Sequence, residues 1–216
     1  MKNIQAITGI AAIVQGVALA VLLVFILVLL PSLGIGGSDL YTAAKILPAV
    51  HSPLLALFYT LFLTFGVTLV LIVLGIDDRT HGQARRLMVL ARAASLAGLV
   101  AYSSYTILGL VTVSGAAGAV PARLSLMHVI LTIAPVAAVT TTAVWGWAAA
   151  KAGVLPAALC WVVIAASLLR LVTIFNQFPI LVLLQLGGSV VWSWWLAGVL
   201  LRQKVSSAAL GASMAV

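Results

Sequence analysis

The sequence predicts an all-α, polytopic membrane protein with six transmembrane helices, and three observations support this. Hydrophobic residues make up 64% of the 216 residues and charged residues only 6%, which is too apolar for a water-soluble protein. Six apolar runs each reach the about 20 residues that a helix needs to cross a bilayer. The runs are continuous rather than alternating, which excludes a transmembrane β-barrel.

The predicted spans lie at 7–30, 53–76, 87–113, 125–150, 156–175 and 180–201. They leave room for a single six-helix transmembrane domain, 1–202, and a short cytoplasmic tail, 203–216, which we expect to fray. The first run is too long for the apolar core of a signal peptide, so we expect it to stay as an anchor. In the longest loop, Ser38 is expected to N-cap a short helix that ends at Leu47. Pro135 predicts a kink in the fourth span.

The basic residues predict the orientation. With the N-terminus in the cytoplasm, seven Lys and Arg residues lie on the inner side and only Lys45 and Arg123 on the outer side. Because cytoplasmic loops are enriched in Lys and Arg, we expect both termini inside, in a multi-pass protein of the inner (plasma) membrane. All six tryptophans fall toward the inner helix ends, where we expect them to anchor the interface. The net charge of +8 is suited to anionic membrane lipids and not to nucleic acid, because no groove-reading element is present.

Polar residues gather on one side of each predicted helix. At about 100° per residue, such a stripe marks the face that turns away from lipid. The stripes in chain order are Thr8 and Gln15; Thr60, Thr64 and Thr68; Arg92, Ser95, Tyr102, Ser103 and Thr106; His128, Thr132, Pro135, Thr142 and Gly146; Ser167, Arg170, Thr173 and Gln177; and Gln185, Gly188, Ser189 and Trp192. We expect these faces to meet inside the bundle, either as ordinary contacts between helices or as a binding site.

Arg170 is the residue most suggestive of a site. It lies about 21 Å along its span, in the outer half of the membrane. The chain has no glutamate, and its three aspartates fall in the predicted loops, so no predicted span offers a carboxylate to pair with it. Arg170 then either extends to the outer headgroups or lines an outward-facing pocket for a small anionic or lipid ligand. The candidate ligand-binding residues are Arg170, His128, Gln185, Thr106 and Tyr102.

Catalytic chemistry is hard to find in this sequence. No hydrolase, kinase or intramembrane protease signature is present, and we expect no catalytic residues. Cys160 is the only cysteine, and we expect neither a disulfide nor a metal site. His128 and His51 are candidate axial haem ligands, although nothing in their spacing singles them out.

The last third of the chain carries a resemblance. Gly153-Val154-Leu155-Pro156 leads into a helix with Trp161, and the final run ends in the sequence WWLAGVLLR at 194–202. In this order of elements the chain resembles a broad family of uncharacterised bacterial six-span integral membrane proteins. That family typically begins the helix with a Pro-Trp-Leu-like sequence, whereas here four residues lie between Pro156 and Trp161. The resemblance implies a fold and no activity.

Three functional hypotheses follow. The leading one is a membrane subunit or scaffold without catalytic activity, which packs against other membrane proteins or lipids. The second is a carrier or binding protein for a small anionic or lipid ligand in a pocket at Arg170. The third is a redox subunit that binds haem or quinone.

Overall fold

The structure is a computed structural model that describes residues 2–35, 51–114, 119–175 and 179–213. Within these ranges the chain is helical apart from short turns, which confirms the all-α prediction. The elements are α1 (Lys2–Val24), the π-helical η1 (Phe25–Leu29), α2 (Leu30–Ser32), α4 (Pro53–Thr80), α5 (Arg85–Ser114), α6 (Val120–Ala152), α7 (Ala157–Phe175) and α8 (Pro179–Ser213). The short helix expected over 38–47 lies outside the described residues.

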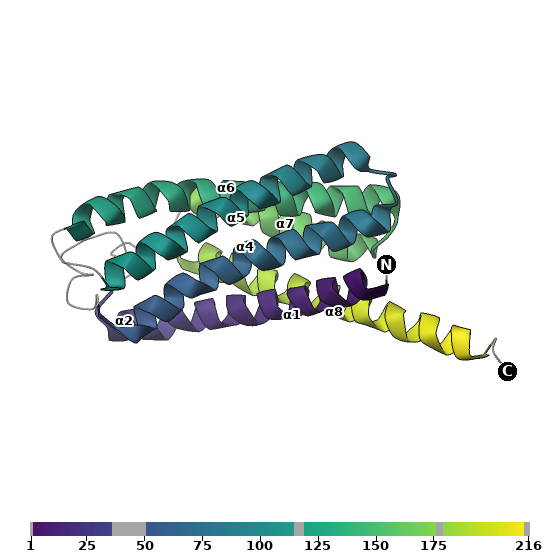
Figure 1. The fold of residues 1–216 in the computed structure, drawn as a ribbon, viewed down its shortest axis with the longest axis horizontal. Helices are drawn as coiled ribbons and strands as arrows, with labels where there is room; N and C mark the ends of the chain where they lie inside the picture. Colours follow the sequence, from purple (N-terminus) through teal and green to yellow (C-terminus); the bar gives the residue numbers. More distant parts are fainter. Residues whose placement is uncertain (1, 36–50, 115–118, 176–178, 214–216) are drawn as a thin grey trace.

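The long helices form a closed ring. Each packs against the next along the chain, and α1 packs against α8 to complete the circle (Figure 1). The start of α1 and the turns at 80–85 and 152–157 lie at one end of the bundle, which we call the N-terminal end (Figure 1). Neighbouring helices therefore run in opposite directions, and the first and last helices lie side by side.

Among the described residues, five helical segments are long and apolar enough to cross a membrane: Asn3–Ser32, Pro53–Thr80, Arg85–Ser114, Val120–Ala152 and Ile180–Arg202. Helix α7 is shorter, at 19 residues, or about 28 Å at a rise of 1.5 Å per residue. The chain is thus a helical membrane protein with five clear candidate spans and one shorter apolar helix.

The interior holds two hydrophobic clusters, one above the other along the bundle axis. The cluster nearer the N-terminal end includes Met88, Trp145 and Leu196, and the other includes Phe62 and Tyr105. On α1, α6 and α8 the clusters are separated by buried polar residues: Gln15, Thr142 and Ser189. A polar layer therefore divides the core near the middle of the bundle.

The end of α4 differs from the prediction. The helix continues past residue 76 to Thr80, so Asp77, Asp78 and Arg79 belong to its last turns rather than to a loop. Arg79 is only 8% exposed, and its Nη2 donates to Gln5 Oε1 at 3.4 Å. The expectation that Asp77 and Asp78 fall in a loop was therefore wrong, and α1 packs beside these turns of α4.

Only part of the polar stripe expected on α6 faces the interior of the bundle. Thr142 is buried, whereas Thr132 and His128 are exposed. Buried or half-buried apolar residues at heptad-like spacing occupy the inward face: Leu124, Met127, Leu131, Ala134 and Ala138. His128 lies about 100° around the helix from Met127, which turns its side chain out of the bundle.

The tryptophans serve two different roles. Trp147 and Trp161 are exposed, and their rings meet edge to face at 6.0 Å beside the α6–α7 turn. Trp145 and Trp192 are buried and pack edge to face at 5.8 Å. The expectation that all six anchor the interface was therefore wrong for this second pair, which belongs to the core.

Helix α8 runs well past its predicted end at residue 201 and stops only at Ser213. The chain after residue 202, which we expected to fray, is therefore helical through Ser213. Its alanines at 208, 209 and 212 are strong helix formers. Figure 1 shows the last turns of α8 projecting beyond the N-terminal end of the ring.

Candidate functional site

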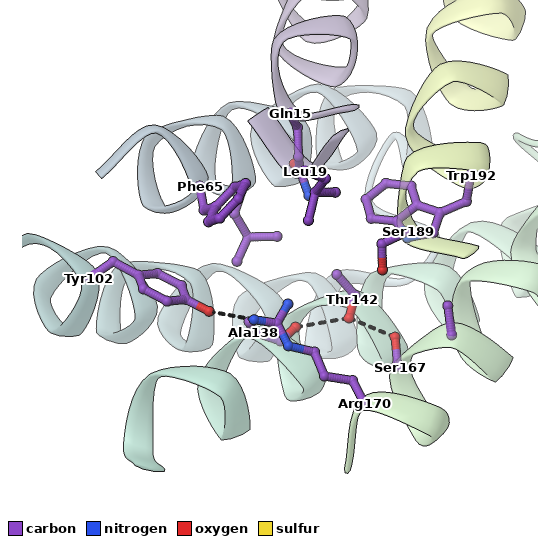
Figure 2. A pocket seen from close by; sticks show the side chains of 12 residues that line it. Gln15, Leu19, Phe65, Tyr102, Ala138, Thr142, Ser167, Arg170, Ser189 and Trp192 are labelled. Atoms are coloured by element: carbon purple, nitrogen blue, oxygen red, sulfur yellow. Dashed lines mark hydrogen bonds between the residues drawn. The ribbon is translucent and has the colours of Figure 1, made fainter. Parts of the chain in front are cut away.

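A small cavity lined by both polar and apolar side chains lies inside the ring, and all six long helices contribute to it (Figure 2). We call it the axial cavity. The space open to water-sized molecules is about 30 Å³, which is room for about two waters. Its lining is Gln15 and Leu19 of α1, Phe65 and Leu69 of α4, Tyr102 of α5, Ala138 and Thr142 of α6, Ala166, Ser167 and Arg170 of α7, and Ser189 and Trp192 of α8.

The cavity lies near the middle of the membrane-spanning part. Thr142 lies ten residues before the end of α6, and Ser167 lies ten residues after the start of α7. Both are therefore about 15 Å from the N-terminal end, which is half the thickness of a typical hydrocarbon core of about 30 Å. Arg170 lies about one turn further from that end.

Arg170 brings the charge to this site. Its Nη2 donates a hydrogen bond to Tyr102 Oη at 2.8 Å, from α7 to α5 (Figure 2). These two helices are not neighbours in the ring, because α6 lies between them. A guanidinium has five N–H donors, and among the described residues Tyr102 is the partner that binds it. The positive charge is therefore met by a neutral phenol, and its other donors can bind water or a ligand.

Hydroxyl groups form the side of the cavity beneath Arg170. Thr142 Oγ1 and Ser167 Oγ are 2.6 Å apart and link α6 to α7 (Figure 2). Each hydroxyl also lies within 2.9 Å of a carbonyl of its own helix, Ala138 O and Val163 O. Each has a single proton to donate, so one hydroxyl donates to the other, and that other donates to its own carbonyl. The pair leaves lone pairs free to accept a hydrogen bond from a molecule in the cavity.

Gln15 extends from α1 toward the cavity from the opposite side (Figure 2). It is only 7% exposed, and its Oε1 atom is buried without a hydrogen-bond partner. A buried polar atom without a partner costs about 1–3 kcal/mol. A water or ligand that donates a proton in the cavity would remove that cost.

The structure brings together only some of the predicted site residues. Arg170 and Tyr102 line the cavity and are bonded to each other. Gln185 is buried one turn away, and its Nε2 donates to Ser189 Oγ at 3.2 Å. Thr106 is buried between α5 and α4, where it donates to Tyr59 O at 2.9 Å.

The two histidines lie elsewhere. His128 and His51 are both exposed, and neither lines the axial cavity. His51 Nδ1 lies 3.1 Å from Val113 O at the end of α5. The expectation that His128 shares a pocket with Arg170 was therefore wrong, because the apolar residues of α6 take the inward face.

Four polar lining residues were not among the predicted site residues: Gln15, Thr142, Ser167 and Ser189. All four stood on the polar stripes, so the signal was present in the sequence. The cavity also holds no cluster of metal ligands. Among the described residues, no group of three His, Cys, Asp or Glu side chains is close enough to hold a metal ion.

No family model matches the chain, and no curated protein or solved structure is significantly similar to it. The resemblance to a six-span family therefore stays a prediction. A function is therefore inferred from the geometry of the site.

Proposed function

We propose that this protein binds, and carries across the membrane, a small anion held at Arg170 in the axial cavity. The observation that supports this proposal most directly is the Arg170 guanidinium, which lines a cavity within the helix ring and has a neutral phenol as its partner. A cation in a membrane interior is expensive unless it is paired. An anion that enters the cavity supplies the missing negative charge.

The size of the cavity limits the ligand. A space of about 30 Å³ suits a halide, or a small inorganic anion such as nitrate, that displaces one of the about two waters and leaves the other beside it. Arg170 donates N–H groups to the anion, and a water beside the anion can donate to a free lone pair of the Thr142 and Ser167 hydroxyls. A water beside the anion can donate to Gln15 Oε1, which satisfies this acceptor without placing it against negative charge.

We also propose that the chain crosses the inner (plasma) membrane six times, with both termini in the cytoplasm. The supporting observation is the charge at the N-terminal end, where Arg85, Arg86 and Lys151 lie next to the helix turns. Helix α7 is long enough to cross when its ends are covered by longer neighbours. The scaffold and redox hypotheses stay predictions, and no contact among the described residues favours either.

The test is anion-dependent thermal unfolding of the purified protein in mild detergent at constant ionic strength. Sodium gluconate, whose anion is too large for the cavity, is replaced stepwise by chloride or nitrate. A ligand that binds only the folded state raises the unfolding temperature, so the wild-type protein should become more stable and the effect should saturate. Arg170→Gln should abolish this response, and Arg170→Lys should restore part of it, because an ammonium lacks the planar fork of donors.

Arg92→Gln is the matched control. Arg92 lies on α5 and pairs with Asp77, away from the axial cavity, so this variant should keep the response to small anions. An equal response in wild type and Arg170→Gln would overturn the proposal. Anion flux into liposomes then distinguishes a carrier from a binding protein. A carrier shows anion flux that depends on Arg170, whereas a binding protein shows the stabilisation but no such flux.

A further inference from the structure

A long groove runs along the outside of the bundle between α1 and α4. It consists of two adjoining hollows of about 450 and 330 Å³, each within the usual size range of ligand sites. Ile7 and Leu71 line both hollows, so the two are continuous. One reaches toward the middle of the bundle, at Leu63 and Thr64, and the other ends at the charged last turns of α4. We call the whole the α1–α4 groove.

Most of the groove is apolar. Its walls include Ile10, Val14, Leu63 and Val67, all of which are exposed on the surface of the bundle. From Leu63 to Asp77 the groove follows 14 residues of α4, or about 21 Å at 1.5 Å per residue. This exceeds the depth of one leaflet, about half of the 30 Å hydrocarbon core. The groove therefore has the length and chemistry to take one acyl chain of a lipid.

The charged end of the groove has an acceptor oxygen without a donor. Asp77, Asp78 and Arg92 line it. Arg92 forms an ion pair with Asp77, and Arg79 interacts electrostatically with Asp78. The Nη2 of Arg79 donates to Gln5 on α1, and Asp78 Oδ2 has no hydrogen-bond partner.

The position of these aspartates is unfavourable for negative charge. They lie in the last turns of α4, where the helix dipole places partial negative charge and favours a cation. Arg92, by way of α5, and Arg79 supply two cations. Asp78 is left at an unfavourable helix end, with an acceptor oxygen that needs an N–H donor.

We propose that the α1–α4 groove binds a zwitterionic phospholipid with a primary-amine headgroup, of the phosphatidylethanolamine type. One acyl chain lies along Val67 and Ile10, the ammonium donates to the carboxylate of Asp78, and the phosphate lies toward Arg92. A choline headgroup has no N–H to donate, so it cannot satisfy Asp78 Oδ2. An anionic glycerol headgroup brings no positive charge to the two carboxylates. This proposal does not depend on the axial cavity.

Native mass spectrometry of the detergent-purified protein tests the proposal, with dioleoyl lipids that differ only in headgroup. Phosphatidylethanolamine, phosphatidylcholine and phosphatidylglycerol are added at equal concentration, and the bound fraction of each is measured. The wild-type protein should prefer the ethanolamine lipid over the choline lipid about tenfold, equivalent to about 1.4 kcal/mol, the size of one hydrogen bond to a charged group. Asp78→Asn should reduce this preference to about unity, with normal helicity by circular dichroism and a single peak in size exclusion.

A second variant tests the acyl part of the groove. Val67→Trp fills the groove and should lower binding of all three lipids, whereas Val100→Trp, at an exposed position on α5 outside the groove, should not. Equal retention of the ethanolamine and choline lipids by the wild-type protein would overturn the proposal. So would a preference for the glycerol lipid, or an ethanolamine preference that survives in Asp78→Asn.

Discussion

Thr8 of α1 lies directly against Gly75 of α4, so that a Cβ added to Gly75 would overlap the Thr8 hydroxyl. Thr8 is buried, and its Oγ1 donates to Ile4 O at 2.8 Å. Close approach of helices at small residues is a main source of packing energy in membranes, where no hydrophobic force draws helices together. This contact holds α1 and α4 together at the floor of the α1–α4 groove.

Gly75→Ala is therefore expected to destabilise the protein by about 1–3 kcal/mol, the usual cost of forcing an extra group into a packed interior. Thermal unfolding in detergent measures the loss. Gly98→Ala on α5 is the matched control, because an added Cβ there would lie 3.7 Å from Ala137 Cβ, an ordinary contact. Equal effects of the two substitutions on stability would contradict the close packing of Thr8 against Gly75.

The hydroxyl pair on α6 and α7 should contribute a measurable coupling energy. Ser167→Ala removes the bond to Thr142 Oγ1, and hydrogen bonds between membrane helices are worth about 0.6 kcal/mol on average and about 1.7 at most. A double-mutant cycle with Thr142→Val isolates the pairwise term. A coupling energy of zero would mean that the 2.6 Å contact adds nothing to stability.

Tyr102→Phe should destabilise the protein more than most Tyr→Phe changes do. It removes the acceptor for the partly buried Arg170 Nη2, and a fully buried donor left without a partner would cost about 1–3 kcal/mol, which sets the upper end of the expected loss. The loss should shrink when Arg170→Gln is already present, because the charge that needs the phenol is then gone. Additive losses in the double variant would show that the two residues act independently.

The variant Gln15→Met tests whether the axial cavity contains water or an anion, or is dry. Methionine keeps the approximate volume of glutamine and removes the unpartnered Oε1 atom. In gluconate, the variant should be as stable as wild type or more so, since a buried unsatisfied acceptor has been deleted. In chloride or nitrate, it should show a smaller stabilisation than wild type. An undiminished anion response would remove Gln15 from the proposed binding site.

The orientation can be tested with single cysteines in a Cys160→Ser background. Gln83→Cys at the α4–α5 turn should react with a membrane-impermeant reagent only from the cytoplasmic side, and Ala122→Cys at the start of α6 only from the outside. Gln83 is preferable to its neighbour Gly82, whose φ of 82° is unfavourable for any residue with a side chain. Labelling of Gln83→Cys from the outside alone would reverse the proposed topology.

Hydropathy was sufficient to predict the helices, because crossing a bilayer demands long apolar runs whatever the neighbours are. The polar stripes on α7 and α8 also led to the site, since Ser167, Arg170 and Ser189 all line the axial cavity. Helical periodicity alone could not decide whether His128 or Thr142 on α6 faces the axial cavity. That choice depends on which arc of the helix its neighbours cover, and this is a property of the packed ring.

The end of α4 shows a second limit of sequence reasoning. Asp77, Asp78 and Arg79 read as a hydrophilic loop because their composition is that of a solvated turn. In the structure, α1 lies beside them and buries Arg79. Charge in the sequence thus predicted neither the end of the helix, which continues to Thr80, nor the environment of these residues, which is set by residues such as Gln5, 74 positions away in the chain.

The contact between α1 and α8 has a consequence for biogenesis. Gly16 lies against the indole of Trp194, and Gly9 lies against Leu201, so one flank of α1 is completed by the helix that is synthesised last in the ring. A nascent chain that has inserted α1 to α7 has an open seam there, and the polar side chain of Gln15 faces lipid through it. Insertion of α8 closes the seam and encloses Gln15 and Arg170 in the same step, so the interior site forms only after α8 has been synthesised.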